Sequence, residues 1–277
     1  MNDFYIDHRH VAAVADPPLE HSHDRFEIAF FIQARLNIFV KDINYTIGAG
    51  NLLLINEYDI HRIVYSPRTP YTRYVIHFSR SFLSSYLQQL GISDLFRELA
   101  ELPYQKVTLN LKQTTELQSL FQTLLKLAPT SGGQEQPALT TALVKSYLLI
   151  ILSKFRELVT AATPAGNYKK DHQVQLIIQY IDRHYMDQLT LDGLAQRFHL
   201  SKFHISHIFK AVTGFTVNQY LQRRRVIEAQ KLLQDPAADP FDVSYRCGFN
   251  HLQHFYRVFK AIAQTTPVRY QRKHAPR

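Results

Sequence analysis

The sequence predicts an α+β protein, in which an N-terminal β-barrel with following helices precedes a C-terminal all-α domain. Three observations predict it. Short apolar runs alternate with turn residues up to residue 78, apolar residues then recur at spacings of three and four, and one residue pattern occurs twice near the C-terminus. The 277 residues are 45% apolar, enough to give about two domains a core each, which excludes disordered and collagen-like proteins.

The region from residue 26 to 78 predicts strands. Its apolar or alternating runs are rich in β-branched and aromatic residues and cover residues 26–32, 36–40, 45–47, 51–56, 61–65 and 71–78. Turn-forming residues such as Gly48, Gly50, Pro67 and Pro70 lie between them. Many short strands at this spacing predict a sandwich or a small barrel.

Two amphipathic helices are predicted between residues 81 and 159. Leu117, Phe121 and Leu124 mark the apolar face of the first, and Tyr147 and Ile151 mark that of the second. These wide faces could cover the barrel or pair with another copy of the chain. A small, polar segment then predicts a linker at 161–171, which divides a domain at 1–160 from one at 172–277.

Charge differs sharply between the two parts. Residues 1–167 hold 15 basic and 15 acidic residues, whereas residues 168–277 hold 17 basic and 8 acidic ones and so carry the whole net charge of +9. A neutral part joined to a basic one indicates that the C-terminal part meets a polyanion, most simply nucleic acid. The alternative is a basic surface that serves only solubility.

An internal repeat lies within the basic part at a separation of 50 residues. Phe209, Thr216 and Tyr220 recur as Phe259, Thr266 and Tyr270. Each copy has the apolar spacing of a helix-turn-helix unit, at about 190–210 and 241–260, and residues 216–234 predict one long helix between them. Such a rod would set two recognition helices about one turn of B-form DNA apart.

Helix caps fix which side chains face outward. We expect Thr190 and Ser201 to cap the two helices of the first unit, and Asp242 to start the second unit, which turns at Gly248. The residues then expected to read base edges are Lys202, Phe203, Ser206, His207, Leu252, Gln253, Tyr256 and Arg257.

Arg257 can donate two hydrogen bonds to guanine, and Gln253 offers adenine an equivalent pair. Phosphate contacts are expected from Ser201, Lys210, Arg223, Arg224, Arg225 and Lys260. RNA binding is a weaker alternative, because the part lacks the aromatic-rich sheet motif of common RNA readers and paired recognition helices suit the wide major groove of B-form DNA.

The segment 177–270 resembles the DNA-binding domain of the AraC/XylS family of bacterial transcription regulators. The resemblance rests on LDGLAQRFHLS at 191–201, ISHIFK at 205–210, TG at 213–214, Tyr220, Arg225, Ala229, GF at 248–249, FYRVFK at 255–260 and TPVRY at 266–270. Two positions depart from the family pattern. Gln264 stands where the family usually has glycine, and Ser244 where it usually has alanine.

The longest apolar runs, such as residues 52–55 and 148–152, are far shorter than the roughly 20 residues of a membrane-spanning helix, so we expect a soluble, cytoplasmic protein. The resemblance implies a regulator, an activator or a repressor, that binds promoter DNA as a homodimer. It implies contact with RNA polymerase if the protein activates transcription, and an N-terminal barrel that binds a sugar or related metabolite as effector. It implies no catalytic residues, no cofactor and no membrane. The single cysteine, Cys247, agrees with a reducing compartment.

The histidines of the first part allow two interpretations. His21, His23, Glu27 and His61 have the spacing of a metal site in a cupin barrel, with His77 further along. The same pattern resembles the opening of sugar-sensing AraC-family barrels, in which these residues line the effector pocket. The main hypothesis is therefore a cupin-like effector-binding and dimerisation domain without metal, and the alternative is a metal-dependent cupin enzyme with a DNA-binding tail.

Overall fold

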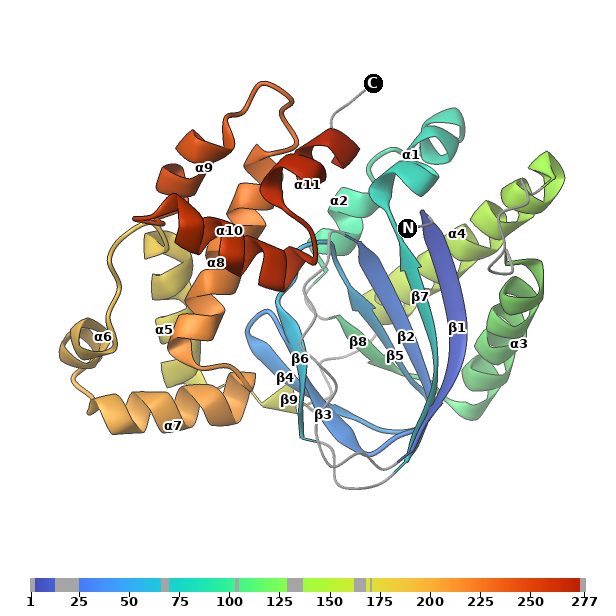
Figure 1. Ribbon diagram of the computed structural model, residues 1–277. Coiled ribbons are helices and arrows are strands. Elements are labelled where there is room, and N and C mark those ends of the chain that lie inside the picture. Colours follow the sequence, from blue (N-terminus) through green and yellow to red (C-terminus); the bar gives the residue numbers. More distant parts are fainter. Residues whose placement is uncertain are drawn as a thin grey trace.

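The computed structural model describes residues 3–12, 25–65, 70–102, 105–128, 137–161, 168–169 and 171–274. Strands form the first part of the chain (Figure 1). They are β1 (Phe4–Val11), β2 (Phe26–Gln33), β3 (Leu36–Val40), β4 (Ile43–Ile47), β5 (Asn51–Ile55), β6 (His61–Tyr65), β7 (Tyr71–Phe78), β8 (Lys106–Thr108) and β9 (Tyr168–Lys169).

These strands make two antiparallel sheets, of order β1-β7-β2-β5-β8 and β6-β3-β4-β9. Alternate residues of each strand point into the space between the sheets, where Phe31, Ile38, Tyr45 and Leu53 are buried together. The predicted barrel is confirmed. The sequence analysis did not predict β1, β8 or β9: β8 and β9 are very short, and only two residues of β1, Phe4 and Ile6, are buried.

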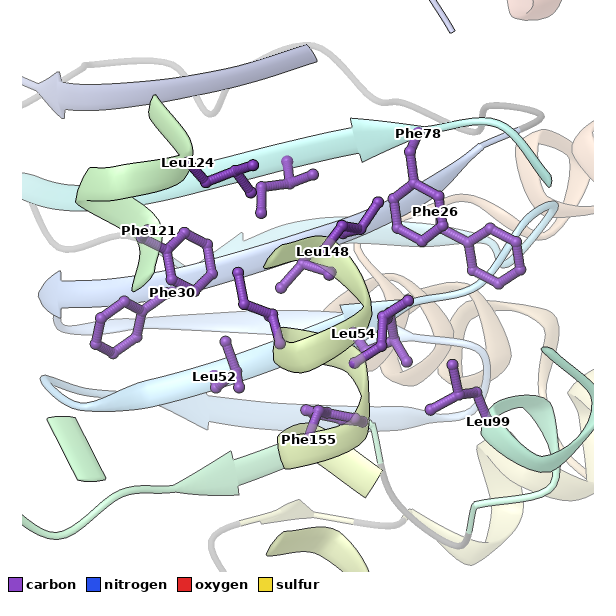
Figure 2. Packing of buried hydrophobic residues seen from close by; sticks show 14 of the residues in the cluster. Phe26, Phe30, Leu52, Leu54, Phe78, Leu99, Phe121, Leu124, Leu148 and Phe155 are labelled. Atoms are coloured by element: carbon purple, nitrogen blue, oxygen red, sulfur yellow. The ribbon is translucent and has the colours of Figure 1, made fainter. Parts of the chain in front are cut away.

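Four helices cover the outer face of the five-stranded sheet. They are α1 (Arg80–Gln89), α2 (Leu95–Ala100), α3 (Leu111–Leu127) and α4 (Ala138–Ala161). Phe121 of α3 and Leu148 and Phe155 of α4 lie over Phe30 and Leu52 of the sheet (Figure 2). The sequence left open whether α3 and α4 cover the barrel or pair with another copy of the chain. In the structure of the single chain they cover the barrel.

Within the described residues, α4 is the one helix long and apolar enough to cross a membrane by length and composition alone. The sequence showed only short apolar runs here, and the structure joins them into a single helix of 24 residues. Its buried residues include Val144, Ile151 and Leu152, which pack in the core with the sheet. Core helices of globular proteins meet the same criterion.

The C-terminal part is entirely helical from residue 172 onward. Its helices are α5 (His172–His184), α6 (Leu191–Phe198), α7 (Lys202–Thr213), α8 (Val217–Leu232), α9 (Pro240–Arg246), α10 (Leu252–Ala263) and α11 (Pro267–His274). One core surrounds Ile205 and Phe209, and a second surrounds Phe249 and Phe255. Most of the predicted linker at 161–171 lies outside the described residues, and its Tyr168–Lys169 forms β9 against β4.

Candidate nucleic-acid interface and barrel site

The first helix-turn-helix unit consists of α6 and α7. Both start at the predicted caps: the Thr190 hydroxyl accepts a hydrogen bond from the Gly193 amide at 3.0 Å, and the Ser201 hydroxyl accepts one from the His204 amide at 3.2 Å. Between the helices His199 takes a left-handed conformation, with φ of 54°. This left-handed residue ends α6 and reverses the chain within a few residues, so that α6 and α7 pack in one core.

The outward face of α7 carries the side chains predicted to read bases. Lys202, Phe203, Ser206 and His207 are all exposed, and Phe203 is 78% exposed although it is a large apolar residue. Lys202 forms an ion pair with Asp192 at 3.4 Å, an exposed contact that a phosphate could replace. These residues lie on the N-terminal turns of the helix, the part that enters the major groove in known recognition helices.

The second unit consists of α9 and α10, and it presents fewer of the predicted side chains. Gln253 and Arg257 are exposed one helical turn apart on α10. Leu252 and Tyr256 do not face outward as expected but are half-buried against the core of this unit. Their neighbour Phe255 is completely buried in that core, and the helix face that carries Gln253 and Arg257 points to solvent.

The predicted start of this unit at Asp242 is wrong. The cap is Asp239, whose carboxylate accepts a hydrogen bond from the Phe241 amide at 3.0 Å, and Pro240 occupies the first helical position. Proline is favoured there because it has no amide hydrogen to leave unbonded. The predicted turn at Gly248 is confirmed: its φ is 83°, and a Cβ atom would lie 2.7 Å from the carbonyl oxygen of Met186.

The arginines in the middle of α8 all contact neighbouring side chains or backbone, and Arg225 is the buried one of the three. Arg223 stacks over Phe215 at 4.8 Å, and the Nε atom of Arg224 lies 3.2 Å from the Asp182 carboxylate. Arg225 is 8% exposed. The phosphate contact expected from Arg225 therefore does not agree with its burial between neighbouring helices. Arg223 and Arg224 are half-exposed, and their phosphate contacts stay a prediction.

The other expected phosphate-binding residues remain accessible. Lys210 and Lys260 are exposed at equivalent positions of α7 and α10. The hydroxyl of Ser201 is engaged as a helix cap, and its residue is exposed. His204 and His251 are also exposed near the N-terminal turns of these two helices, and they were not predicted as DNA contacts. Each lies next to a buried or half-buried position, Ile205 and Leu252.

In the barrel, the structure brings together three of the five residues predicted for the effector pocket. Glu27 on β2 pairs in register with His77 on β7, and its Oε2 atom lies 3.9 Å from the Nε2 atom of His77 and 3.7 Å from that of His61. Arg73 joins them, with its Nη1 atom 3.3 Å from Oε1 of Glu27. The Nδ1 atom of His61 lies 2.9 Å from the carbonyl oxygen of Asp59.

This cluster is polar, largely buried and enclosed by strands of both sheets. Glu27 is 5% and His61 8% exposed, and the Nε atom of Arg73 is buried without a hydrogen-bond partner. His21 and His23 lie outside the described residues. In the part of the chain that the structure describes, no three histidine, cysteine, aspartate or glutamate side chains are placed to hold a metal ion.

The sequence analysis missed a second polar group on β1. Phe4 and Ile6 face the helices, so Tyr5, Asp7 and Arg9 face the interior side of the sheet, beside His77 and Arg73 in register. Asp7 accepts hydrogen bonds of 2.8 Å from Tyr5 and from Arg9. Burial acts to raise the pKa of Asp7, but these hydrogen bonds outweigh it and hold that pKa below its ordinary value.

The signal that could have found this group is the alternation in residues 4–9, where aromatic or aliphatic residues alternate with Tyr5, Asp7 and Arg9. These exposed or half-buried side chains lie at the edge of the barrel, next to Arg73 and His77 of the buried cluster around Glu27. They offer both donors and acceptors and carry both signs of charge. That combination suits a ligand with many hydroxyl groups.

Cys247 has no place in either site. It is completely buried, and burial raises the pKa of its thiol to about 12, with the nearby Glu228 carboxylate acting in the same direction. A thiol with such a pKa is almost entirely protonated at neutral pH and is a poor nucleophile.

Comparison with known proteins agrees with both halves of this arrangement. The profile of the AraC-like ligand binding domain matches residues 18–148, and that of a helix-turn-helix domain matches residues 194–273. The chain is similar to the HTH-type transcriptional activator RhaS of Escherichia coli (strain SE11), with 25% identity over 254 residues that cover 91% of this chain and 87% of the relative.

RhaS of Salmonella heidelberg (strain SL476) is 24% identical over 249 residues, which cover 90% of this chain and 85% of the relative. Among solved structures, ToxT from Vibrio cholerae aligns over 98% of both chains with 12% identity and a TM-score of 0.41. The two matched domains stand in the order that the structure shows, sensor barrel first and helix-turn-helix units second. The chain therefore belongs to the AraC family of transcriptional regulators, a family of DNA-binding proteins and not of enzymes.

Proposed function

We propose that this regulator binds two neighbouring major-groove segments of promoter DNA through α7 and α10, under the control of a sugar or related metabolite bound in the barrel. The observation that carries the proposal is the pair of exposed recognition faces on a domain that holds all of the net positive charge. Lys202, Ser206, Gln253 and Arg257 are the proposed base readers, and Lys210 and Lys260 contact phosphates.

The barrel cluster supports the effector half of the proposal. A neutral polyol would accept hydrogen bonds from Arg73 and donate them to Glu27, and the charges of these two side chains already balance. A carboxylic acid would upset that balance by adding a second anion beside Glu27. We therefore propose an uncharged polyhydroxylated effector.

The first experiment sequences genomic fragments that the purified full-length protein retains at physiological salt. Enrichment of a few promoter sites with two short blocks about one helical turn apart is the expected result, and the genes beside them would nominate the effector. Uniform retention that disappears as salt rises would reduce the protein to a nonspecific DNA binder.

A second experiment tests the barrel. A panel of monosaccharides is screened for a rise in the thermal unfolding temperature, since a ligand bound only to the folded state stabilises it by mass action. The rise given by any active sugar should vanish in Glu27→Gln and persist in Glu116→Gln, a change on the surface helix α3. An equal rise in both variants would place the sugar elsewhere.

The relatives are named as activators, and we propose that this chain also activates transcription, in the cytoplasm, as a homodimer that contacts RNA polymerase. Exposed apolar side chains on α3 and α4 support the dimer, among them Leu111 at 84% and Leu139 at 73% exposed. Sedimentation equilibrium of the parent and of Leu139→Glu tests it. Two monomeric proteins would contradict the proposed dimer.

A further inference from the structure

The turn between β5 and β6 of the barrel reaches the second half of the DNA-binding domain. Gln234, just after α8, donates a hydrogen bond of 2.7 Å from Nε2 to the Tyr58 hydroxyl. The same hydroxyl lies 3.2 Å from that of Tyr270 on α11. Both partners belong to the part of the domain that holds α10 in place, because Tyr270 packs edge-on against Phe259 of α10 at 5.7 Å.

Arg62, four residues further along, reaches the first half. Its Nη1 atom donates a hydrogen bond to the carbonyl oxygen of Gly214, the residue that ends α7, and its guanidinium lies 5.2 Å from the centre of the Phe215 ring. Asn44 of β4 adds a hydrogen bond of 3.2 Å to the carbonyl oxygen of Val212. Residues 58–62 of the barrel therefore touch the end of the first helix-turn-helix unit and, through Gln234 and Tyr270, the segments that flank the second.

The contact at α7 depends on a glycine. Gly214 has φ of 75°, and a Cβ atom on it would lie 2.8 Å from Cδ of Arg62. A larger residue would have to displace the arginine as well as adopt a left-handed backbone. The proposed recognition residues of α7 lie at its N-terminal end. The barrel contacts the C-terminal end of the helix and leaves the N-terminal turns accessible.

The turn itself is held in an unusual conformation. Tyr58 has φ of 65°, a left-handed conformation that is unfavourable for a residue other than glycine. The amide of Asp59 donates to the carbonyl oxygen of Asn56 at 3.1 Å, the amide of Asn56 donates to the Asp59 carboxylate at 3.2 Å, and Lys41 lies 3.5 Å from that carboxylate. This conformation directs Tyr58 toward the helices.

The barrel and the helices share an apolar core, in which Phe39 and Ile60 of the barrel are buried with Phe209 and Phe215. Beside this core lies a cleft of about 390 Å³, lined by Asp42 and Asp59 on the barrel side and by Asp182 and Arg224 on the helical side. Since Ile60 anchors the segment in the core, the directional bonds of Tyr58 and Arg62 on either side of it fix how the helices are oriented against the barrel.

We propose that residues 57–62 are a positioning element for DNA binding, a clamp that holds the end of α7 directly and α10 through Tyr270 of α11 and, together with α8, sets the separation of α7 and α10. The inference rests on the proposed function. His61 lies in the same segment between the barrel cluster and Arg62, so a molecule bound beside Glu27 would act directly on the clamp.

The first test measures the separation without DNA, so its result is independent of whether the promoter proposal holds. Nitroxide labels are attached at Ser206→Cys and Gln253→Cys, both exposed, while the buried Cys247 stays unlabelled. Pulsed dipolar spectroscopy should give one narrow distance distribution near ~34 Å in the labelled parent. Adding Tyr58→Phe and Arg62→Ala should broaden or shift it, and an unchanged distribution would overturn the clamp.

Matched controls separate the clamp from general destabilisation. Tyr86→Phe removes a tyrosine hydroxyl bonded to Ser146, and Arg97→Ala removes an exposed arginine that pairs with Asp94, both within the sensor part. These changes should leave the distribution narrow. If Arg62→Ala does not fold, Arg62→Lys with Tyr58→Phe replaces it, since lysine keeps the charge and loses the planar group over Phe215.

A second readout uses a duplex library in which two blocks recovered from the genomic selection are separated by every spacing from 0 to about 12 base pairs. The parent should retain one spacing strongly, and the Tyr58→Phe, Arg62→Ala protein should retain neighbouring spacings within about threefold. A clamp variant that still selects the single spacing of the parent would also overturn the inference.

Discussion

The Nε atom of Arg225 donates a hydrogen bond of 2.7 Å to the backbone carbonyl oxygen of Tyr185. Its Nη2 atom donates another, of 2.8 Å, to that of Asp187, and its guanidinium lies 5.6 Å from the Phe249 ring. One side chain of α8 thus ties the end of α5 to the core of the second unit. Burial lowers the pKa of Arg225, in agreement with an internal position.

Arg225→Ala should therefore lower the free energy of unfolding by about 2–4 kcal/mol, because it leaves two partly buried carbonyl oxygens without donors. Chemical denaturation of the parent and the variant measures this. Arg225→Lys should recover only part of the loss, since one amine cannot reach both oxygens as the planar group does. A variant of unchanged stability whose DNA binding loses salt dependence would restore the phosphate contact expected from the sequence.

Arg257→Ala should relax sequence preference at one base pair by roughly 1–3 kcal/mol, because its exposed guanidinium is placed to bond a base edge. Binding to a set of single-base variants of a selected site measures it. Lys260→Ala, one turn further along α10, is the matched control: it should weaken every sequence alike and reduce the salt slope by about 1. Equal losses on all sequences for Arg257→Ala would exclude base reading by this residue.

Gln264→Gly should stabilise the protein by about 1 kcal/mol. Gln264 ends α10 with φ of 54°, a left-handed conformation that glycine adopts without the cost of a side chain. The change also removes an exposed hydrogen bond to the carbonyl oxygen of Ala261, a smaller effect. Gln122→Gly, at an exposed position inside α3, is the control and should destabilise by a similar amount. Destabilisation by both changes would show that the left-handed conformation of Gln264 does not reduce the stability of the protein.

Cys247 should resist alkylation in the folded protein. With a thiol pKa of about 12, only a minute fraction is thiolate at pH 8, and the side chain is fully buried. Iodoacetamide labelling followed by intact mass should show no adduct in buffer and one adduct in guanidinium chloride. Modification in buffer at the rate of the denatured protein would mean that the core around Phe249 opens freely.

The order of the two parts, the strands from residue 26 to 78 and the two helix-turn-helix units could all be predicted from the sequence. These depend on local patterns: the alternation of apolar residues, the caps Thr190 and Ser201, and the glycine turn at Gly248. Because such signals act within a few residues, they can be found along a single chain. The same is true of the exposed face of α7, whose Ile205 and Phe209 fix the buried side.

Whether a long polar side chain is buried or exposed depends on contacts between distant segments, which the sequence does not show. Arg225 follows no apolar pattern that would mark it as internal, yet it is buried because the carbonyl oxygens of Tyr185 and Asp187, just after α5, accept its hydrogen bonds. Arg223 is half-buried over Phe215, which lies between α7 and α8. Leu252 turns inward for the same reason, because a neighbouring helix covers it. The contacts of Arg62 with Gly214 join residues 152 positions apart, and no local pattern records a separation of that length.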